Sequence, residues 1–227
     1  LRLRILTGVI LSTITMAHAE IGTSADTATN TESTVDNQSV LKRPLTLVPE
    51  IGSTYFHITG ADSGYRSANM VGASARFATS NPRLNWSAGV QYLQTGYKLK
   101  EDFGIFTLNL ADISMDYLAI PLKGEYMMSD PASQGIRYFA TAGLTPAYLL
   151  SARLKNLVDS TEKEKGIRND MNGLDTLAGI GFGGRYDTNI GSFDLTFEYQ
   201  KGLMNISKEE NLKNEGFTAK AGYNFIL

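Results

Sequence analysis

Few side chains in this sequence could carry out covalent chemistry. The chain has no cysteine and two histidines, which excludes thiol nucleophiles, disulfide frameworks and cysteine-ligated zinc. His57 could act as a general base if Ser114 and Asp112 lay beside it at one rim of a sheet. No sequence spacing specifies that trio. We therefore interpret His57 as a loop or aromatic-belt residue, with a catalytic role as the alternative.

Two other segments match patterns that bind ligands in other proteins. Residues 179–184 fit the G-x-G-x-x-G expression, but a dinucleotide site needs that loop between a strand and a helix. Here a tight turn and another strand follow, so we interpret the glycines as inward residues that leave room for larger side chains. Residues 156–172 carry mixed charges without calcium or zinc spacing, which favours a solvated loop. The sequence predicts no catalytic residue, no metal and no cofactor.

Composition excludes two further classes of protein. Lys plus Arg number 21 against 23 Asp plus Glu, and this near balance gives no field that would attract nucleic acid. No run of about 18 or more apolar residues occurs, which excludes a membrane-spanning helix. Strands remain as the only way in which this chain could cross a membrane.

The first residues have the pattern of a targeting segment. Arg2 and Arg4 precede an apolar run, Ile5–Met16, and an A-x-A site follows it. This order predicts a secretory signal peptide over residues 1–19. Residues 20–44 are rich in Thr, Ser, Asp and Asn and predict a disordered periplasmic leader. The folded domain is then expected over 45–227.

From Leu45 onward, the hydrophobic pattern has a period of two. Phe193–Gln200 alternates apolar and polar residues over eight positions without an error, as a strand requires. The same template predicts an all-β chain, and several of its strands are long enough to span a bilayer. The predicted strands lie near 46–57, 69–79, 84–95, 113–127, 136–151, 174–186, 192–201 and 215–227.

Connection lengths predict the architecture. Short turns follow the second, fourth and sixth strands, whereas the other connections, 58–68, 96–112, 152–173 and 202–214, are longer and polar. Short turns at one end and long loops at the other are typical of bacterial outer-membrane barrels. We therefore predict an eight-stranded antiparallel up-and-down transmembrane β-barrel with short periplasmic turns and long extracellular loops.

Aromatic residues on the apolar face support a membrane location. Barrels in bilayers carry an aromatic girdle at each interface, and two groups of aromatics fall near the expected rims. The lower girdle is predicted to contain Tyr126, Tyr138, Tyr186, Phe193, Tyr223 and Phe225. The upper girdle is predicted to contain Tyr55, Tyr92, Tyr117, Tyr148, Tyr199 and Phe217.

The polar face carries as many basic as acidic residues. An eight-stranded barrel is just wide enough for side chains to fill it, and charges confined there must pair. We therefore predict a packed polar lumen rather than an open pore. Its predicted network consists of Glu50, Arg76, Lys123, Glu125, Arg185, Asp194, Glu198 and Lys220. The alternative is a soluble periplasmic barrel with its apolar face around a ligand cavity.

Three segments resemble the outer-membrane β-barrel domain of Gram-negative bacteria, often labelled porin-family or PorT-like. They are DYLAIPLKGEY at 116–126, AGLTPAYLLSA at 142–152 and FEYQKGLMNI at 197–206. The resemblance covers about 46–227 and implies a place in the cell outer membrane, contact with its lipid and insertion by the barrel-insertion machinery. Such barrels usually end in an aromatic residue, whereas this sequence ends in Leu227 with Phe225 two positions before it.

The expected function is structural or interactive, since members of that family do different things. Membrane integrity, adhesion or an accessory role in envelope machinery would all fit, and the extracellular or envelope partner is not specified by the sequence. Two alternatives stay open: a lipid-modifying barrel enzyme that uses His57, and the soluble periplasmic ligand-binding barrel.

Overall fold

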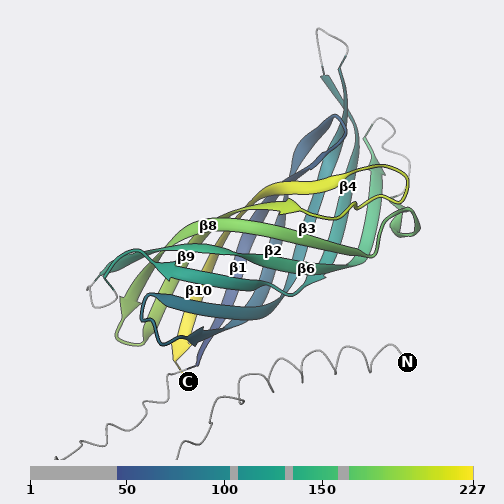
Figure 1. Cartoon of the computed structure of the whole chain (residues 1–227). Helices are drawn as coiled ribbons and strands as arrows, with labels where there is room; N and C mark the ends of the chain where they lie inside the picture. Colours follow the sequence, from purple (N-terminus) through teal and green to yellow (C-terminus); the bar gives the residue numbers. More distant parts are fainter. Residues whose placement is uncertain (1–44, 103–106, 131–134, 158–163, 227) are drawn as a thin grey trace, which may run out of the picture. The chain divides into compact units, whose positions relative to one another are not determined.

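The computed structural model describes residues 45–102, 107–130, 135–157 and 164–226. The predicted signal peptide, 1–19, and the predicted leader, 20–44, lie outside the described residues, as does Leu227. The described chain is almost entirely β-strand and forms the barrel in Figure 1. Within it, no helix is long and apolar enough to cross a membrane.

The strands form one antiparallel sheet that closes into a ring. Their bounds are β1 Thr46–Thr59, β2 Ser63–Ala78, β3 Leu84–Asp102, β4 Thr107–Ala119, β5 Leu122–Met127, β6 Ile136–Asn156, β7 Lys165–Gly166, β8 Leu174–Thr188, β9 Gly191–Gly202 and β10 Lys213–Ile226. β1 pairs with both β2 and β10, which closes the ring. β4 and β5 share one place between β3 and β6. Together with the two-residue β7 added to β6, this confirms the predicted eight-stranded barrel.

Ile120 and Pro121 interrupt the strand position that β4 and β5 share. Proline has no backbone N–H to donate to a strand ladder, so the regular pairing stops there. The wall nevertheless stays closed. The Pro121 carbonyl accepts from the Gly89 N–H at 3.1 Å, and the Ile120 N–H donates to the Pro146 carbonyl at 2.8 Å.

Two of the four predicted long loops are mostly strand. Only residues 60–62 separate β1 from β2, and β3 and β4 extend through most of 96–112. The prediction of loops at 58–68 and 96–112 was therefore wrong. The strands continue beyond the apolar outer band, where their outward residues are polar and their inward residues are apolar. The segments 152–173 and 202–214 do contain loops, next to the ends of β6 and β9.

The barrel interior consists of two layers of different chemistry. We call the layer nearer the chain ends and the tight turns the turn half, and its buried residues include the charged Arg185 and Asp194. We call the other layer the loop half. Its interior is an apolar cluster in which Phe56, Met115 and Leu149 are each no more than 1% exposed.

Loops complete part of the wall of the loop half. Near its far end, β6 pairs with the two-residue β7 in place of β8, and a short 3-10 helix, η2 (Arg168–Asp170), follows. Asn172 ties this segment to the loop after β9, because its Nδ2 donates to the carbonyl of Asn205 at 2.8 Å. Ile206 and Leu212 from that loop are buried in the apolar cluster. The two loops therefore form part of the core.

Candidate functional site: a filled barrel interior and its two surfaces

Four charged residues form the first group in the turn half. Arg185 contacts Asp194 through Nε at 2.8 Å and Glu125 through Nη2 at 2.9 Å. Arg76 contacts the same two carboxylates, with Nη2 at 2.7 Å from Asp194 and 3.1 Å from Glu125. Arg76 also donates to Asn224. Two guanidinium groups therefore share two carboxylates, which satisfies the pairing that buried charges need.

A second group of four lies beside the first. Lys123 Nζ is 2.5 Å from Glu198 Oε2, and Lys220 Nζ is 3.0 Å from Glu50 Oε1 and 3.6 Å from Glu198 Oε1. The structure thus brings all eight residues of the sequence-predicted lumen network into two adjoining clusters. A cavity of about 20 Å³ lies among them, which is room for about one water molecule. Side chains of both clusters therefore pack closely around this small cavity.

Inward glycines of β8 make room for the large side chains of this layer. A Cβ at Gly181 would lie 2.7 Å from Glu198 Cγ, and one at Gly183 would lie 2.4 Å from the Phe139 ring. Phe139 in turn lies under the Arg185 guanidinium, 5.3 Å from its Cζ. The 179–184 segment therefore serves packing inside a strand, and no helix follows it.

The outer surface of the turn half is apolar and aromatic. The predicted lower-girdle residues Tyr138 and Tyr186 are 57% and 53% exposed there, and the predicted upper-girdle residue Phe217, at the boundary with the loop half, is 52% exposed. The remaining outward girdle residues are Tyr55, Tyr92, Tyr126, Tyr148, Phe193, Tyr199, Tyr223 and Phe225.

Tyr117 corrects the predicted upper girdle. It is 2% exposed and lies inside the barrel, where its hydroxyl contacts Met115 Sδ at 3.5 Å and lies 3.4 Å from Asn214 Nδ2. Adjacent residues of a strand point to opposite faces. Leu118 faces outward, at 38% exposed, so Tyr117 must face inward.

The loop half also corrects the predicted polar lumen. Its interior cluster contains sixteen buried apolar residues, drawn from β1, β2, β3, β4, β6 and β8 and from the loops. Burial there raises the pKa of Tyr97, which lies beyond the apolar outer band, to about 12. One small polar group lies at its edge: Asp175, 2% exposed, accepts from Asn214 Nδ2 at 2.8 Å. Sequence reasoning missed Asp175, although its inward parity with Leu177 in β8 was a usable signal.

The outer surface of the loop half is polar. Asp116 accepts from Gln94 Nε2 at 2.9 Å and from Arg153 Nη2 at 3.1 Å. Further along the same strands, Arg66 Nε is 2.8 Å from Asp112 Oδ1. Lys98 and Lys155 lie on either side of Asp112 in the strand register. Such a surface is suited to water rather than to lipid tails.

The candidate catalytic trio is not assembled. His57 lies on β1, whereas Ser114 and Asp112 lie on β4, with β2 and β3 between them, and Asp112 is paired with Arg66. The His57 Nδ1 lies 3.0 Å from the Ile58 carbonyl, and its ring is 4.4 Å from that of Tyr65. Across the ladder His57 faces Glu215. Among the described residues, no group of three or more His, Cys, Asp and Glu could hold a metal ion.

The closed ring, the apolar outer band and the packed interior define an integral outer-membrane β-barrel. The chain belongs to the outer membrane protein beta-barrel domain family, whose model matches residues 18–208. Its location is accordingly the bacterial outer membrane. No curated protein matches the chain.

Solved outer-membrane barrels have a similar fold. Neisserial surface protein A from Neisseria is 13% identical, with 80% of this chain and 97% of that chain covered at a TM-score of 0.48. Ail, the attachment invasion locus protein of Yersinia pestis, is 14% identical, with coverage of 80% and 99% and a TM-score of 0.42. The protease OmpT of Escherichia coli is 9% identical, with coverage of 81% and 95% and a TM-score of 0.39.

Proposed function

We propose that this protein is a non-conducting outer-membrane barrel with a structural and interaction role. The observation that supports this most is the filled interior. Ion pairs occupy the turn half, with a cavity of only about 20 Å³, and a packed apolar cluster occupies the loop half. A diffusing solute would have to displace both layers, so permeation is not the function that this interior favours.

The polar outer surface of the loop half supports the interaction role. The strands carry it beyond the apolar band, so it stands in water on the far side of the membrane from the tight turns. Lys98 and Lys155 have no ion pair in the described residues, and they flank the Arg66–Asp112 pair. This charged face can bind a partner without any change inside the barrel.

Conductance and complementation test the two parts of the proposal separately. The purified protein in planar bilayers should show no stable open channel, and a sustained conductance would contradict the sealed interior. In a deletion strain, the Lys98→Glu/Lys155→Glu variant should fold and insert like the parent protein, yet lose its activity in surface-attachment and envelope-permeability assays. Full complementation by this variant in all these assays would contradict an interaction role for this face.

A second candidate, a lipid-modifying enzyme, is not favoured by the position of His57. The serine and the acid that would complete its site lie three strands away around the barrel.

A further inference from the structure

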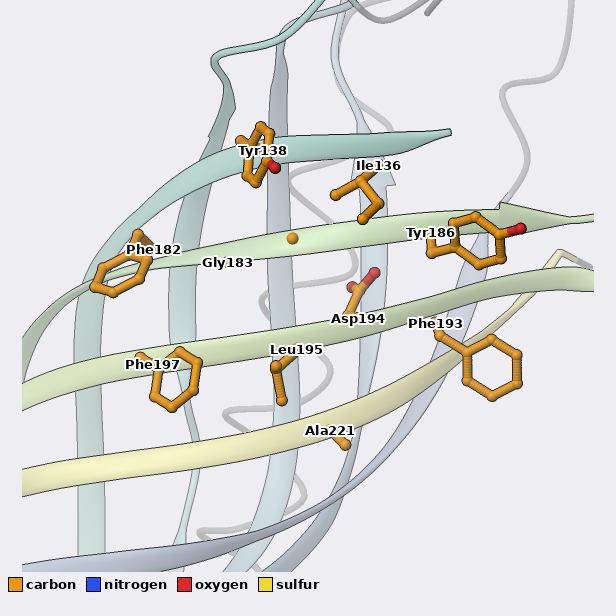
Figure 2. A pocket seen from close by; sticks show the side chains of 11 residues that line it. Ile136, Tyr138, Phe182, Gly183, Tyr186, Phe193, Asp194, Leu195, Phe197 and Ala221 are labelled. Atoms are coloured by element: carbon orange, nitrogen blue, oxygen red, sulfur yellow. The ribbon is translucent and has the colours of Figure 1, made fainter. Parts of the chain in front are cut away.

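An apolar groove crosses the membrane-facing surface near the tight turns. It is lined by residues of β6, β8, β9 and β10 and has a volume of about 520 Å³. Figure 2 shows Phe182 and Phe197 on one side, Tyr186 and Phe193 on the other, and Leu195 and Ala221 between them.

The strand register explains the floor of the groove. Tyr138 pairs with Gly184, Gly184 with Leu195, and Leu195 with Ala221, so one row of outward positions crosses four strands. Two of these positions are Gly184 and Ala221, which add little or no side-chain volume to the floor. The neighbouring rows on β8 and β9 carry aromatic residues, and these form two ridges. The ring centroids of Phe182 and Phe197 are 5.8 Å apart in one ridge, and those of Phe193 and Tyr223 are 4.8 Å apart at the other.

The width and chemistry of the groove select its occupant. Phe182 and Tyr186 are four residues apart, roughly 13 Å between Cα atoms at about 3.3 Å per residue, and the rings fill part of that span. A helix with its side chains needs about 10–12 Å and does not fit between the ridges. The one charged residue at the groove, Asp194, turns its carboxylate inward to Arg185. A single unbranched hydrocarbon chain fits the remaining apolar space.

We propose that this groove binds one acyl chain of a phospholipid of the periplasmic leaflet. The groove is continuous with the apolar band by which the barrel contacts the membrane, and it lies in the half that carries the tight turns and the chain ends. The hydroxyls of Tyr138 and Tyr186 supply polar groups at its edge (Figure 2). Lipid is therefore held at a defined place on this surface.

Gly184 allows a precise test. A Cβ built there meets only Ile136 Cγ2, at 3.5 Å, which is an ordinary contact, so a larger side chain fills the groove without disturbing the wall. Gly184→Leu is the groove-filling variant. Ala73→Leu is the matched control, because Ala73 is exposed on the outer face of β2, away from the strands that line the groove.

Native mass spectrometry of the full chain in detergent, titrated with dipalmitoyl phosphatidylethanolamine, measures the affinity for the first lipid. The parent protein and Ala73→Leu should bind this lipid at least about tenfold more tightly than Gly184→Leu does. The leucine side chain would fill the groove, so that a few methylenes of the acyl chain are no longer buried. Should Gly184→Leu fail to fold, Gly184→Ala and Ala221→Leu should show smaller losses. Equal affinity in all variants would overturn the proposal, as would a preference of the parent protein for lipid A over the phospholipid.

Discussion

On the outer face of β3, Trp86 and Val90 are more than half exposed in the turn half, whereas Gln94 and Lys98 occupy the same face in the loop half. Inside the barrel the order is reversed. The turn half carries charges, whereas the loop half carries side chains such as Leu93, which is 1% exposed. The alternation of inward and outward residues continues along β3, but the apolar residues lie on the outer face in the turn half and on the inner face in the loop half.

The solvent outside each half explains this exchange. Lipid surrounds the turn half, so its outward residues must be apolar and the polar set can lie only inside. Water surrounds the loop half, so the ordinary rule of a soluble barrel applies there and the apolar set turns inward. The level at which the apolar residues change from the outer face to the inner face therefore marks the edge of the membrane on the side of the loop half.

The largest expected effect comes from placing a charge in the apolar interior. Met115 is 0% exposed among apolar side chains, so Met115→Lys would bury an unpaired charge and should cost more than about 4 kcal/mol of unfolding free energy. Urea unfolding in detergent micelles measures it. Met115→Leu is the control and should cost less than about 1.5 kcal/mol. Equal stability of the two variants would mean that water fills the interior of the loop half, and would contradict the packed apolar cluster.

Removing a charge from the turn half should cost somewhat less. Arg185→Met leaves Glu125 and Asp194 with Arg76 as their remaining cationic partner, and loss of one partner of a buried ion pair costs about 3 kcal/mol. The same unfolding assay applies. Adding Glu125→Gln should recover much of the loss, because Arg76 and Asp194, whose Nη2 and Oδ2 are 2.7 Å apart, then remain as a neutral pair. A single variant as stable as the parent protein would contradict the buried network.

Two lysine substitutions on one face of β3 compare the outer surfaces directly. Val90→Lys places a charge in the lipid-facing band and should cost about 1–2 kcal/mol, between the values for the bilayer midplane and its edge. Gln94→Lys, four residues along, should change stability by less than about 0.5 kcal/mol, since it lies in water beside Asp116. Equal costs at the two positions would place the membrane edge elsewhere.

The smallest expected effect concerns His57. His57→Ala should leave the lipid A and phospholipid profiles of the outer membrane unchanged, because Ser114 and Asp112 lie three strands away and the His57 Nδ1 lies against the Ile58 carbonyl. Mass spectrometry of extracted lipids checks this result. A changed acylation pattern in the variant strain would instead support an enzyme.

The sequence predicted the wall of the barrel better than its interior. Alternation shows which residues share a face, and in the turn half the lipid-facing set was recognisable from its aromatic residues. Alternation does not show which face points inward. Ile113, Met115 and Tyr117 form an apolar set like those of the turn half, yet they face inward because water lies outside them. The position of the membrane edge along each strand is a tertiary property, and for this reason the long strands were mispredicted. Tyr117 is different, because its parity with the outward Leu118 already placed it on the inward face.

Cysteine accessibility along β3 tests the exchange of faces most directly. The chain has no cysteine, so single substitutions at Ala88, Val90, Leu93, Gln94 and Lys98 can be labelled one at a time in whole cells with a membrane-impermeant maleimide. We expect labelling at 94 and 98, and protection at 88 and 90 by lipid and at 93 by the packed interior. Labelling at 93, or protection at 94 and 98 together with labelling at 90, would contradict the exchange of faces.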